Sequence, residues 1–295
     1  MADAPFTLSR LRRFFVCAAL TIVSLAAHPQ SPALSAEAKS GGDARLPADS
    51  TSRPLICPQP IHVALYDIVP FFDPEHDTGI DRDVITALQE RTHCQFDLVF
   101  ESRVRIWKML TNGALDMTVS GIATPERREF ADFVPYYRAR NVLIMTATVP
   151  PPATPEAFLA NNEMKLGVVK SYVHGPGWDE WISKLRNSGR VIEIADTREL
   201  FRQLDLGHVQ AIPVWQPVSA AMSKRYPTQH RLILLPWFKN QPEVEYCLVL
   251  SKGRVTPELR KLIAENMAAM RKDDSLRKIY RRYLNDEDTG LMLLP

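Results

Sequence analysis

The sequence lacks the motifs that identify the common nucleotide-dependent and hydrolytic enzymes. It holds no GxGxxG dinucleotide fingerprint, no GxxxxGKS/T phosphate-binding loop and no GxSxG nucleophile elbow. Cysteine is scarce, at four residues, and no CxxC or His-rich spacing indicates a metal site. We therefore expect neither a metal nor a cofactor, and these absences favour a binding protein over an enzyme.

An excess of charge of one sign is also missing. Lys and Arg total 36 against 34 Asp and Glu, so the net charge is +2 over 295 residues. Proteins that bind nucleic acid usually present a clearly basic face, so this balance argues against that partner. With 45% hydrophobic and 24% charged residues, the composition is globular, and the length suits one large domain or two smaller ones.

The amino terminus has the pattern of an export signal. Three arginines precede the apolar run 14–27, and small residues follow it. The run is too short for a membrane-spanning helix, which needs about 20 apolar residues. Residues 1–36 are predicted to be a signal peptide and residues 37–54 a disordered linker, with the general and twin-arginine export routes both open. The mature protein is expected in the periplasm, without stable membrane insertion.

Export would place the remaining cysteines in an oxidising compartment, which favours disulfides. Cys57 lies just before an expected strand at 61–66, and Cys94 lies just before another at 95–100. If these strands are parallel neighbours, both cysteines lie at the same edge of the sheet, so we predict a Cys57–Cys94 disulfide. Cys247 falls inside an apolar run and is expected to be a buried free thiol.

Beyond residue 60, strand-like and helix-like patterns alternate. This alternation predicts βαβ units and a mostly parallel sheet covered by helices. The first series has expected strands at 61–66, 95–100, 115–119 and 140–148, and expected helices at 81–92 and 103–112. After a proline-rich stretch at 148–155, the second series has expected strands at 165–170, 190–195, 208–214, 231–236 and 244–250. Its expected helices are one that contains Trp178, Trp181 and Leu185, and others at 197–205, 217–226, 256–271 and 274–284.

Three segments resemble the family 3 extracellular solute-binding proteins, the periplasmic receptors typified by polar amino-acid binders of ABC importers. Residues 78–99 resemble that family's helix opening, and residues 259–284 resemble its closing helix pair. The most specific segment is 107–137, which contains LTNGALD, then Thr-Pro-Glu-Arg at 124–127, then FADFVPYY. The resemblance covers the chain from about residue 57 to residue 285.

The resemblance implies an α/β fold of the periplasmic-binding-protein type II kind. Two α/β lobes would be joined by two crossing strands, with a ligand cleft between them. Lobe 1 would comprise residues 55–147 plus 238–295, and lobe 2 would comprise residues 148–237. The crossing strands would lie near 141–146 and 244–250.

The resemblance also implies the ligand contacts. The arginine of the Thr-Pro-Glu-Arg loop, Arg127, would clamp a ligand carboxylate, because a guanidinium offers a planar, bidentate match. Each expectation has an alternative. Arg127 could be a solvated surface arginine, and the loop after 115–119 could be a simple turn. One of the two phenylalanines, Phe71 or Phe72, could serve only in the core. Further contacts are expected from Ser120, Gly121, Phe71, Phe72, Tyr66, Ser171 and Tyr172.

Three positions depart from the amino-acid binders of that family. Leu65, near Tyr66, takes the place of one aspartate that holds the ligand ammonium, and Trp215 takes the place of another. Asp67 could replace the first aspartate by a small shift. Arg103 stands where an aromatic ring commonly stacks on the ligand, although it could also face solvent. A second cation and two lost carboxylates favour anions over ordinary zwitterionic amino acids.

The favoured function is therefore a periplasmic solute-binding protein. It would capture a small, carboxylate-bearing or anionic solute by hinge closure and, as a monomer, deliver it to an ABC permease. Two alternatives stay open: a dehydratase-like enzyme on the same fold, and an accessory or signalling factor in the periplasm.

Overall fold

The computed structural model describes residues 56, 57 and 59–295. The predicted signal peptide, residues 1–36, and the predicted linker, residues 37–54, lie outside these residues. Within the described part of the chain, no helix is long and apolar enough to cross a membrane.

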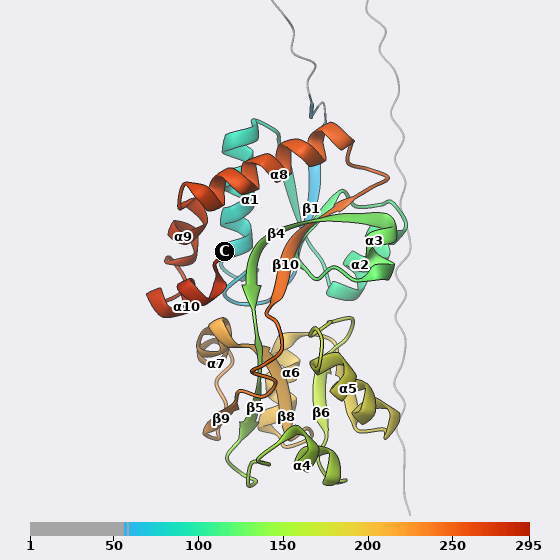
Figure 1. Ribbon diagram of the computed structural model, residues 1–295, viewed down its shortest axis with the longest axis vertical. Helices are drawn as coiled ribbons and strands as arrows, with labels where there is room; N and C mark the ends of the chain where they lie inside the picture. Colours follow the sequence, from blue (N-terminus) through green and yellow to red (C-terminus); the bar gives the residue numbers. More distant parts are fainter. Residues whose placement is uncertain (1–55, 58) are drawn as a thin grey trace, which may run out of the picture. The chain divides into compact units, whose positions relative to one another are not determined.

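The first lobe is built on a five-stranded mixed sheet with strand order β2-β1-β3-β10-β4 (Figure 1). β1 pairs in parallel with both β2 and β3, whereas β10 runs antiparallel to β3 and β4. The strands are β1 (Ile61–Leu65), β2 (Phe96–Phe100), β3 (Met117–Gly121), β4 (Ala131–Ala139) and β10 (Val244–Ser251). The helices are α1 (Ile80–Thr92), α2 (Arg103–Thr111), α3 (Pro125–Phe130), α8 (Pro257–Lys272), α9 (Ser275–Tyr280) and α10 (Asp286–Met292).

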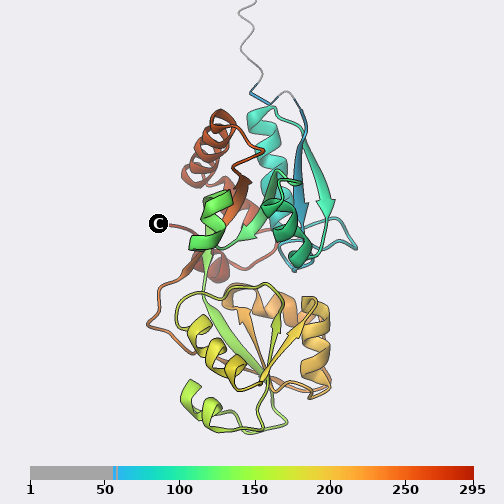
Figure 2. The same ribbon diagram turned by 90° about the vertical axis from the view of Figure 1, so that its right-hand side faces the viewer.

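The second lobe is built on another five-stranded sheet, with strand order β7-β6-β8-β5-β9. Figure 2 shows α5 and α6 on opposite faces of this sheet. The strands are β5 (Asn141–Thr146), β6 (Leu166–Val169), β7 (Val191–Ile194), β8 (Ala211–Trp215) and β9 (Leu232–Leu235). The helices are α4 (Pro155–Ala160), α5 (Trp178–Asn187), α6 (Thr197–Asp205), the 3-10 turn η1 (Gln216–Val218) and α7 (Ser219–Arg225).

Local sequence explains where the helices start and which face they bury. The α8 helix begins after Thr256, whose side chain caps the amide of Leu259, and proline occupies the first helical position. Its residues Leu259, Ile263, Met267 and Met270 recur at helical spacing and are buried. This apolar stripe packs α8 against α1 and against the sheet of the first lobe.

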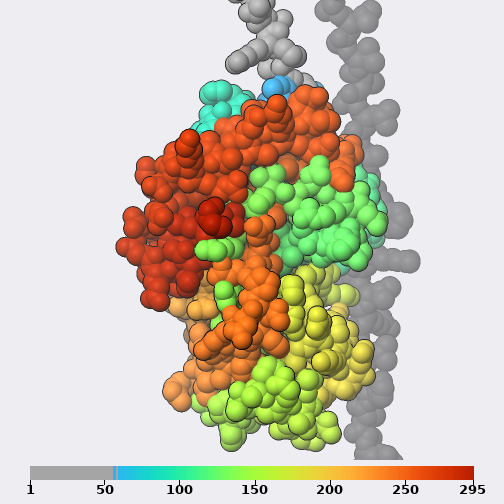
Figure 3. All heavy atoms as spheres, viewed as in Figure 1, coloured from blue at the N-terminus to red at the C-terminus, as the bar shows by residue number. Residues whose placement is uncertain are grey.

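The chain crosses from the first sheet to the second between Ala139 and Asn141, where β4 leads directly into β5 (Figure 1). It returns through residues 236–243, which lie at the surface between the lobes on the face shown in Figure 3. The two expected crossing strands are therefore members of the sheets themselves: β5 belongs to the second sheet and β10 to the first. The expected boundary of lobe 1 at residue 147 is too late, because β5 already lies in the second lobe. The proline-rich stretch 148–155 leads from β5 into α4, whose first residue is Pro155, so it lies within the second lobe and does not separate the lobes.

One strand escaped prediction altogether. β4 is an edge strand with Pro135 near its middle, and proline argues against a central strand because it cannot donate to the ladder. Pairing with β10 shifts register between Tyr246 and Cys247, so Pro135 lies at an irregularity where the missing N–H is tolerated. The short helices α3, α4 and α10 were also not predicted.

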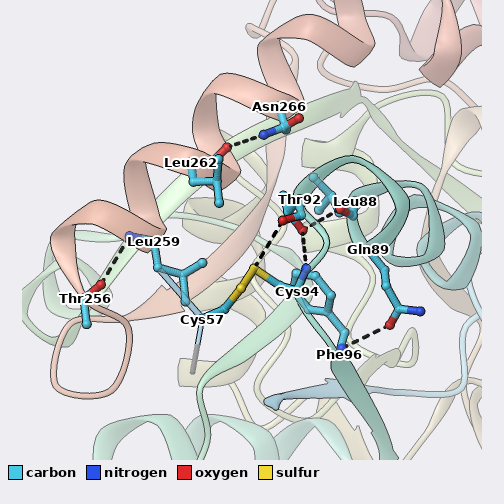
Figure 4. The surroundings of a disulfide bond; sticks show 10 residues. All are labelled: Cys57, Leu88, Gln89, Thr92, Cys94, Phe96, Thr256, Leu259, Leu262 and Asn266. Atoms are coloured by element: carbon cyan, nitrogen blue, oxygen red, sulfur yellow. Dashed lines mark hydrogen bonds between the residues drawn. A yellow bond between two sulfur atoms is a disulfide. The ribbon is translucent and has the colours of Figure 1, made fainter. Parts of the chain in front are cut away.

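The predicted disulfide is confirmed. Cys57 and Cys94 are joined, with 5.6 Å between their Cα atoms, and β1 and β2 are parallel neighbours with Ile61 opposite Phe96. Figure 4 shows the bridge beside Leu259 and Leu262 of α8. Cys247 is a buried free thiol, also as predicted, and burial raises its pKa to about 12.

Candidate functional site

A small cavity of about 10 Å³ lies between the two lobes, following the carboxyl ends of β1 and β8. Its volume is about that of a single water position. Seven of the residues that the sequence analysis singled out line it together. The full lining is Tyr66, Arg103, Ser120, Ile122, Arg127, Ser171, Tyr172, Val173, Trp215 and Tyr246.

Arg127 reaches this cavity from the first turn of α3. The Thr124 side chain caps that turn by accepting the Arg127 amide, and this fixes the direction in which the arginine leaves the helix. Its guanidinium lies over the Trp107 ring, 3.7 Å from the ring centroid. Nη1 donates to the Ile122 carbonyl at 2.9 Å, and Nη2 donates across the cleft to the Ser171 carbonyl at 3.1 Å. Arg127 therefore touches both lobes.

Arg103, the first residue of α2, is the second guanidinium at the cavity and is only 7% exposed. It lies between two aromatic rings, 4.4 Å from the Tyr66 centroid and 4.8 Å from the Trp107 centroid. Its two terminal nitrogens donate to the carbonyls of Val119 and Ser120 at 3.3 and 3.1 Å. Arg103 thus faces the cleft and not solvent.

The two guanidiniums repel each other. Burial first, and then the charge of Arg103, lower the pKa of Arg127 to about 9. None of the residues that line the cavity is an aspartate or a glutamate. The cavity therefore concentrates positive charge without a carboxylate of its own.

Ser120 lies at the cavity, but its hydroxyl points into the first lobe. The residue has a positive φ of 51°, which turns the chain at the end of β3. Its Oγ donates to Asp81 at 2.8 Å and accepts from the Tyr137 hydroxyl at 3.0 Å, while its amide donates to the Tyr136 hydroxyl at 3.0 Å. The part of Ser120 that belongs to the cleft is its carbonyl, which accepts from Arg103.

Asp81 is a buried residue that the sequence analysis did not single out. It is fully buried in α1 and accepts hydrogen bonds from Tyr136 and Ser120. Burial raises its pKa to about 7, although the hydrogen bonds oppose the shift. Its signal in the sequence is its place in the Gly-Ile-Asp-Arg-Asp run at 79–83. That signal is weak, because a polar residue in the first turn of a helix is usually solvated.

The two phenylalanines after β1 do not line the cavity. Phe71 stacks on Tyr137, with 4.7 Å between the ring centroids, and meets Trp215 edge-on at 5.1 Å. Phe72 packs against Phe100. Both are buried, because the loop folds back beneath the cleft, so they support the site from the core.

Gly121 does not line the cavity either. A side chain there would place its Cβ 2.2 Å from a methyl group of Val249 and 3.7 Å from Nη2 of Arg103. Glycine thus lets β10 and Arg103 approach β3 closely. Its role is packing.

The second lobe closes the cavity with Ser171, Tyr172 and Trp215. Ser171 has a positive φ of 68° and presents its carbonyl to Arg127. Tyr172 meets Tyr66 edge-on across the cleft at 6.1 Å. Trp215 packs against Tyr246, a lining residue that the sequence analysis missed because β10 reads only as an apolar run. Ile122, which follows β3, and Val173, in the loop between β6 and α5, also line the cavity and were not singled out from the sequence.

A second set of contacts joins the lobes at another edge of the cleft. Glu75, in the loop before α1, pairs with Arg198 of α6 at 2.5 Å and with Arg225 of α7 at 2.6 Å. Asp73 adds a longer pair with Arg225 at 3.5 Å. We call these four residues the latch. His76 completes a group that could ligate a metal ion, but both carboxylates are already paired with guanidiniums, so we assign no metal there.

Comparisons with known proteins agree with this architecture. The model of the bacterial extracellular solute-binding proteins, family 3, matches residues 66–286. A comparison with curated proteins gave no match.

Solved structures of the same fold include an ancestral arginine-binding protein bound to arginine (TM-score 0.64, 21% identity, 76% of this chain and 98% of that one). A histidine kinase sensor domain with similarity to periplasmic binding proteins gives a TM-score of 0.67 at 16% identity, over 80% and 98% of the chains. The arginine-, lysine-, histidine-binding protein of Geobacillus stearothermophilus gives a TM-score of 0.64 at 20% sequence identity, over 78% of this chain and 98% of that one. This likeness confirms the predicted periplasmic-binding-protein type II fold.

Proposed function

Because this chain belongs to the bacterial extracellular solute-binding proteins of family 3, we propose that it captures a small carboxylate-bearing or other anionic solute between its lobes. The observation that carries the proposal is the pair of guanidiniums, Arg103 and Arg127, at a cavity lined by no carboxylate. A desolvated cation without a counter-charge is costly, and an incoming anion relieves that cost.

The two arginines have different tasks in this proposal. Arg103 is held by carbonyls of its own lobe and between two rings, so it supplies a fixed positive field. Arg127 spends one donor on the Ser171 carbonyl of the opposite lobe. When the lobes separate, that donor is released, and a ligand carboxylate can take the place of the carbonyl. Arg127 is therefore the clamp.

Closure follows from the same contact. The ligand would join Arg127 to the second lobe in place of the direct bond, which ties solute capture to the approach of the lobes. The liganded form would then dock, as a monomer in the periplasm, on the permease of an ABC importer. The cavity lining offers neither a histidine nor a carboxylate for proton transfer, so we propose binding without turnover.

A second candidate is periplasmic sensing. The likeness to a histidine kinase sensor domain supports it, because the same closure can be read by a signalling partner. Association of the liganded protein with a permease, or with a membrane kinase, distinguishes the two functions.

The test is a ligand screen on three arginine variants. The wild type is titrated by calorimetry with monocarboxylates, dicarboxylates, aromatic acids and amino acids. Arg127→Ala should weaken the carboxylate found by about 30-fold to several-thousand-fold, because removing a charge-assisted partner costs roughly 2–5 kcal/mol. Arg127→Lys should recover little, since an ammonium cannot reproduce the bidentate fork.

Arg128→Ala is the matched control. Arg128 follows Arg127 on α3, but it is exposed, lies over Phe133 and does not line the cavity. Its loss should leave affinity unchanged. Tight binding of a cationic amino acid that is undiminished in Arg127→Ala would show that the site is misplaced.

A further inference from the structure

The small cavity opens beside a larger groove. The groove has a volume of about 440 Å³, which is within the range of about 300–1,000 Å³ typical of small-molecule sites. Tyr66, Arg103 and Tyr172 line both spaces, so a ligand held by Arg103 has the groove next to it. Phe100, 55% exposed, adds an apolar wall.

The charges in the groove differ from those in the small cavity. Three carboxylates line the groove, namely Asp67, Glu101 and Asp196. Two of them are engaged, because Glu101 pairs with Arg105 at 3.4 Å and Asp196 caps α6 by accepting the Glu199 amide at 2.8 Å. Asp67 is half-buried, and within the described part of the chain its side chain accepts a hydrogen bond only from the neutral hydroxyl of Tyr226, at 3.1 Å. None of the ion pairs among residues 56, 57 and 59–295 involves Asp67.

Arg198 of the neighbouring latch also lines the groove, and the charges of the two latch guanidiniums lower the pKa of Asp67 and oppose the effect of its burial. These guanidiniums, Arg198 and Arg225, are paired with Glu75 and Asp73. Counted with Asp67, three carboxylates stand against two guanidiniums, which leaves one negative charge in surplus. Burial raises the pKa of Asp67, as expected for a carboxylate without a bonded cation. The cleft is therefore positive at Arg103 and Arg127 and negative at Asp67.

Resting on the proposed function, we propose that the ligand is an elongated amino-carboxylate whose carboxylate lies between Arg103 and Arg127 and whose amino group lies beside Asp67. Its two charges are separated by a carbon chain that packs on Tyr66 and Tyr172. An α-amino acid does not fit this pattern, because its ammonium is one carbon away from the carboxylate and would lie among the guanidiniums. The ligand class is the ω-amino acids and related carboxylates with a distal cation.

Matched pairs of ligands test this assignment. The full chain is titrated by calorimetry with β-alanine, γ-aminobutyrate, δ-aminovalerate and ε-aminocaproate, and with the unsubstituted acids of the same chain lengths. At least one ω-amino acid should bind about tenfold or more tightly than its unsubstituted partner, and more tightly than alanine, because a hydrogen bond between two charged groups supplies that difference.

Asp67→Asn should remove this advantage and leave the unsubstituted acid within about twofold of its wild-type affinity. Asparagine keeps the shape and the acceptor for Tyr226. Glu265→Gln, which removes one exposed negative charge on α8, is the control and should change neither affinity.

The possible results separate the two hypotheses. Carboxylates that bind without preference for a distal amine, or an Asp67→Asn variant that weakens both partners equally, would overturn this inference and leave the carboxylate site standing. If no carboxylate of either series binds, this inference fails. The proposed function fails with it only if the dicarboxylates, aromatic acids and amino acids of the wider screen do not bind either.

Discussion

Removing the Cys57–Cys94 disulfide should destabilise the protein substantially and leave its ligand site intact. The bridge closes a loop with a sequence separation of 37 residues. In the chain-entropy model, closing a loop of that length lowers the entropy of the unfolded chain and so raises its free energy by about 3.8 kcal/mol at 25 °C. For a folded part of this size, that corresponds to a drop of about 8 to 15 °C in melting temperature.

The site should be spared because the bridge and the cleft lie at opposite ends of the same strands. Cys57 and Cys94 precede β1 and β2, whereas Tyr66 and Arg103 follow their carboxyl ends. A Cys57→Ser/Cys94→Ser double variant should therefore keep wild-type affinity for a carboxylate.

The assay is denaturant unfolding with and without a reductant. The wild type should lose stability on reduction, and the double variant should be unaffected by the reductant. Equal unfolding midpoints for the oxidised wild type and the double variant would refute the reasoning, since the loop would then already be restricted without the bond.

Three further outcomes are expected. Arg103→Ala should weaken anions while sparing neutral ligands, as measured by calorimetry. Glu75→Gln should open the latch, so that carboxylate affinity falls about two- to fivefold and loses part of its dependence on salt; a salt response identical to that of the wild type would contradict this. Asp81 takes up a proton in the folded state between its unfolded pKa of 3.8 and its folded pKa of about 7, so its contribution makes stability fall as pH rises through that window. Unfolding titrations should show a shallower fall in Asp81→Asn.

The placement of the site residues depended on how strongly each local pattern dictates its own structure. The Thr-Pro-Glu-Arg run forms the capped first turn of α3, a helix that was not predicted, and Arg127 lies at the cavity, as the family resemblance implies. Ser120 was expected in a loop after the strand 115–119, but it lies within β3, and its hydroxyl turns inward because it bonds to Asp81 and to the hydroxyls of two tyrosines. No spacing along the chain encodes those partners.

The sequence by itself determined the alternation of most strands and helices and the pairing of Cys57 with Cys94. Each of these depends on short-range periodicity, capping or the shared edge of neighbouring parallel strands. Only the tertiary structure decided that the chain changes sheets at Arg140, that Phe71 packs against Tyr137 and Trp215 in the core, and that Asp67 faces the groove without an ion-pair partner among residues 56, 57 and 59–295. Those features depend on which side chains from distant parts of the sequence come into contact. The burial of Phe71 and the charge balance around Asp67 are set only when these segments pack together.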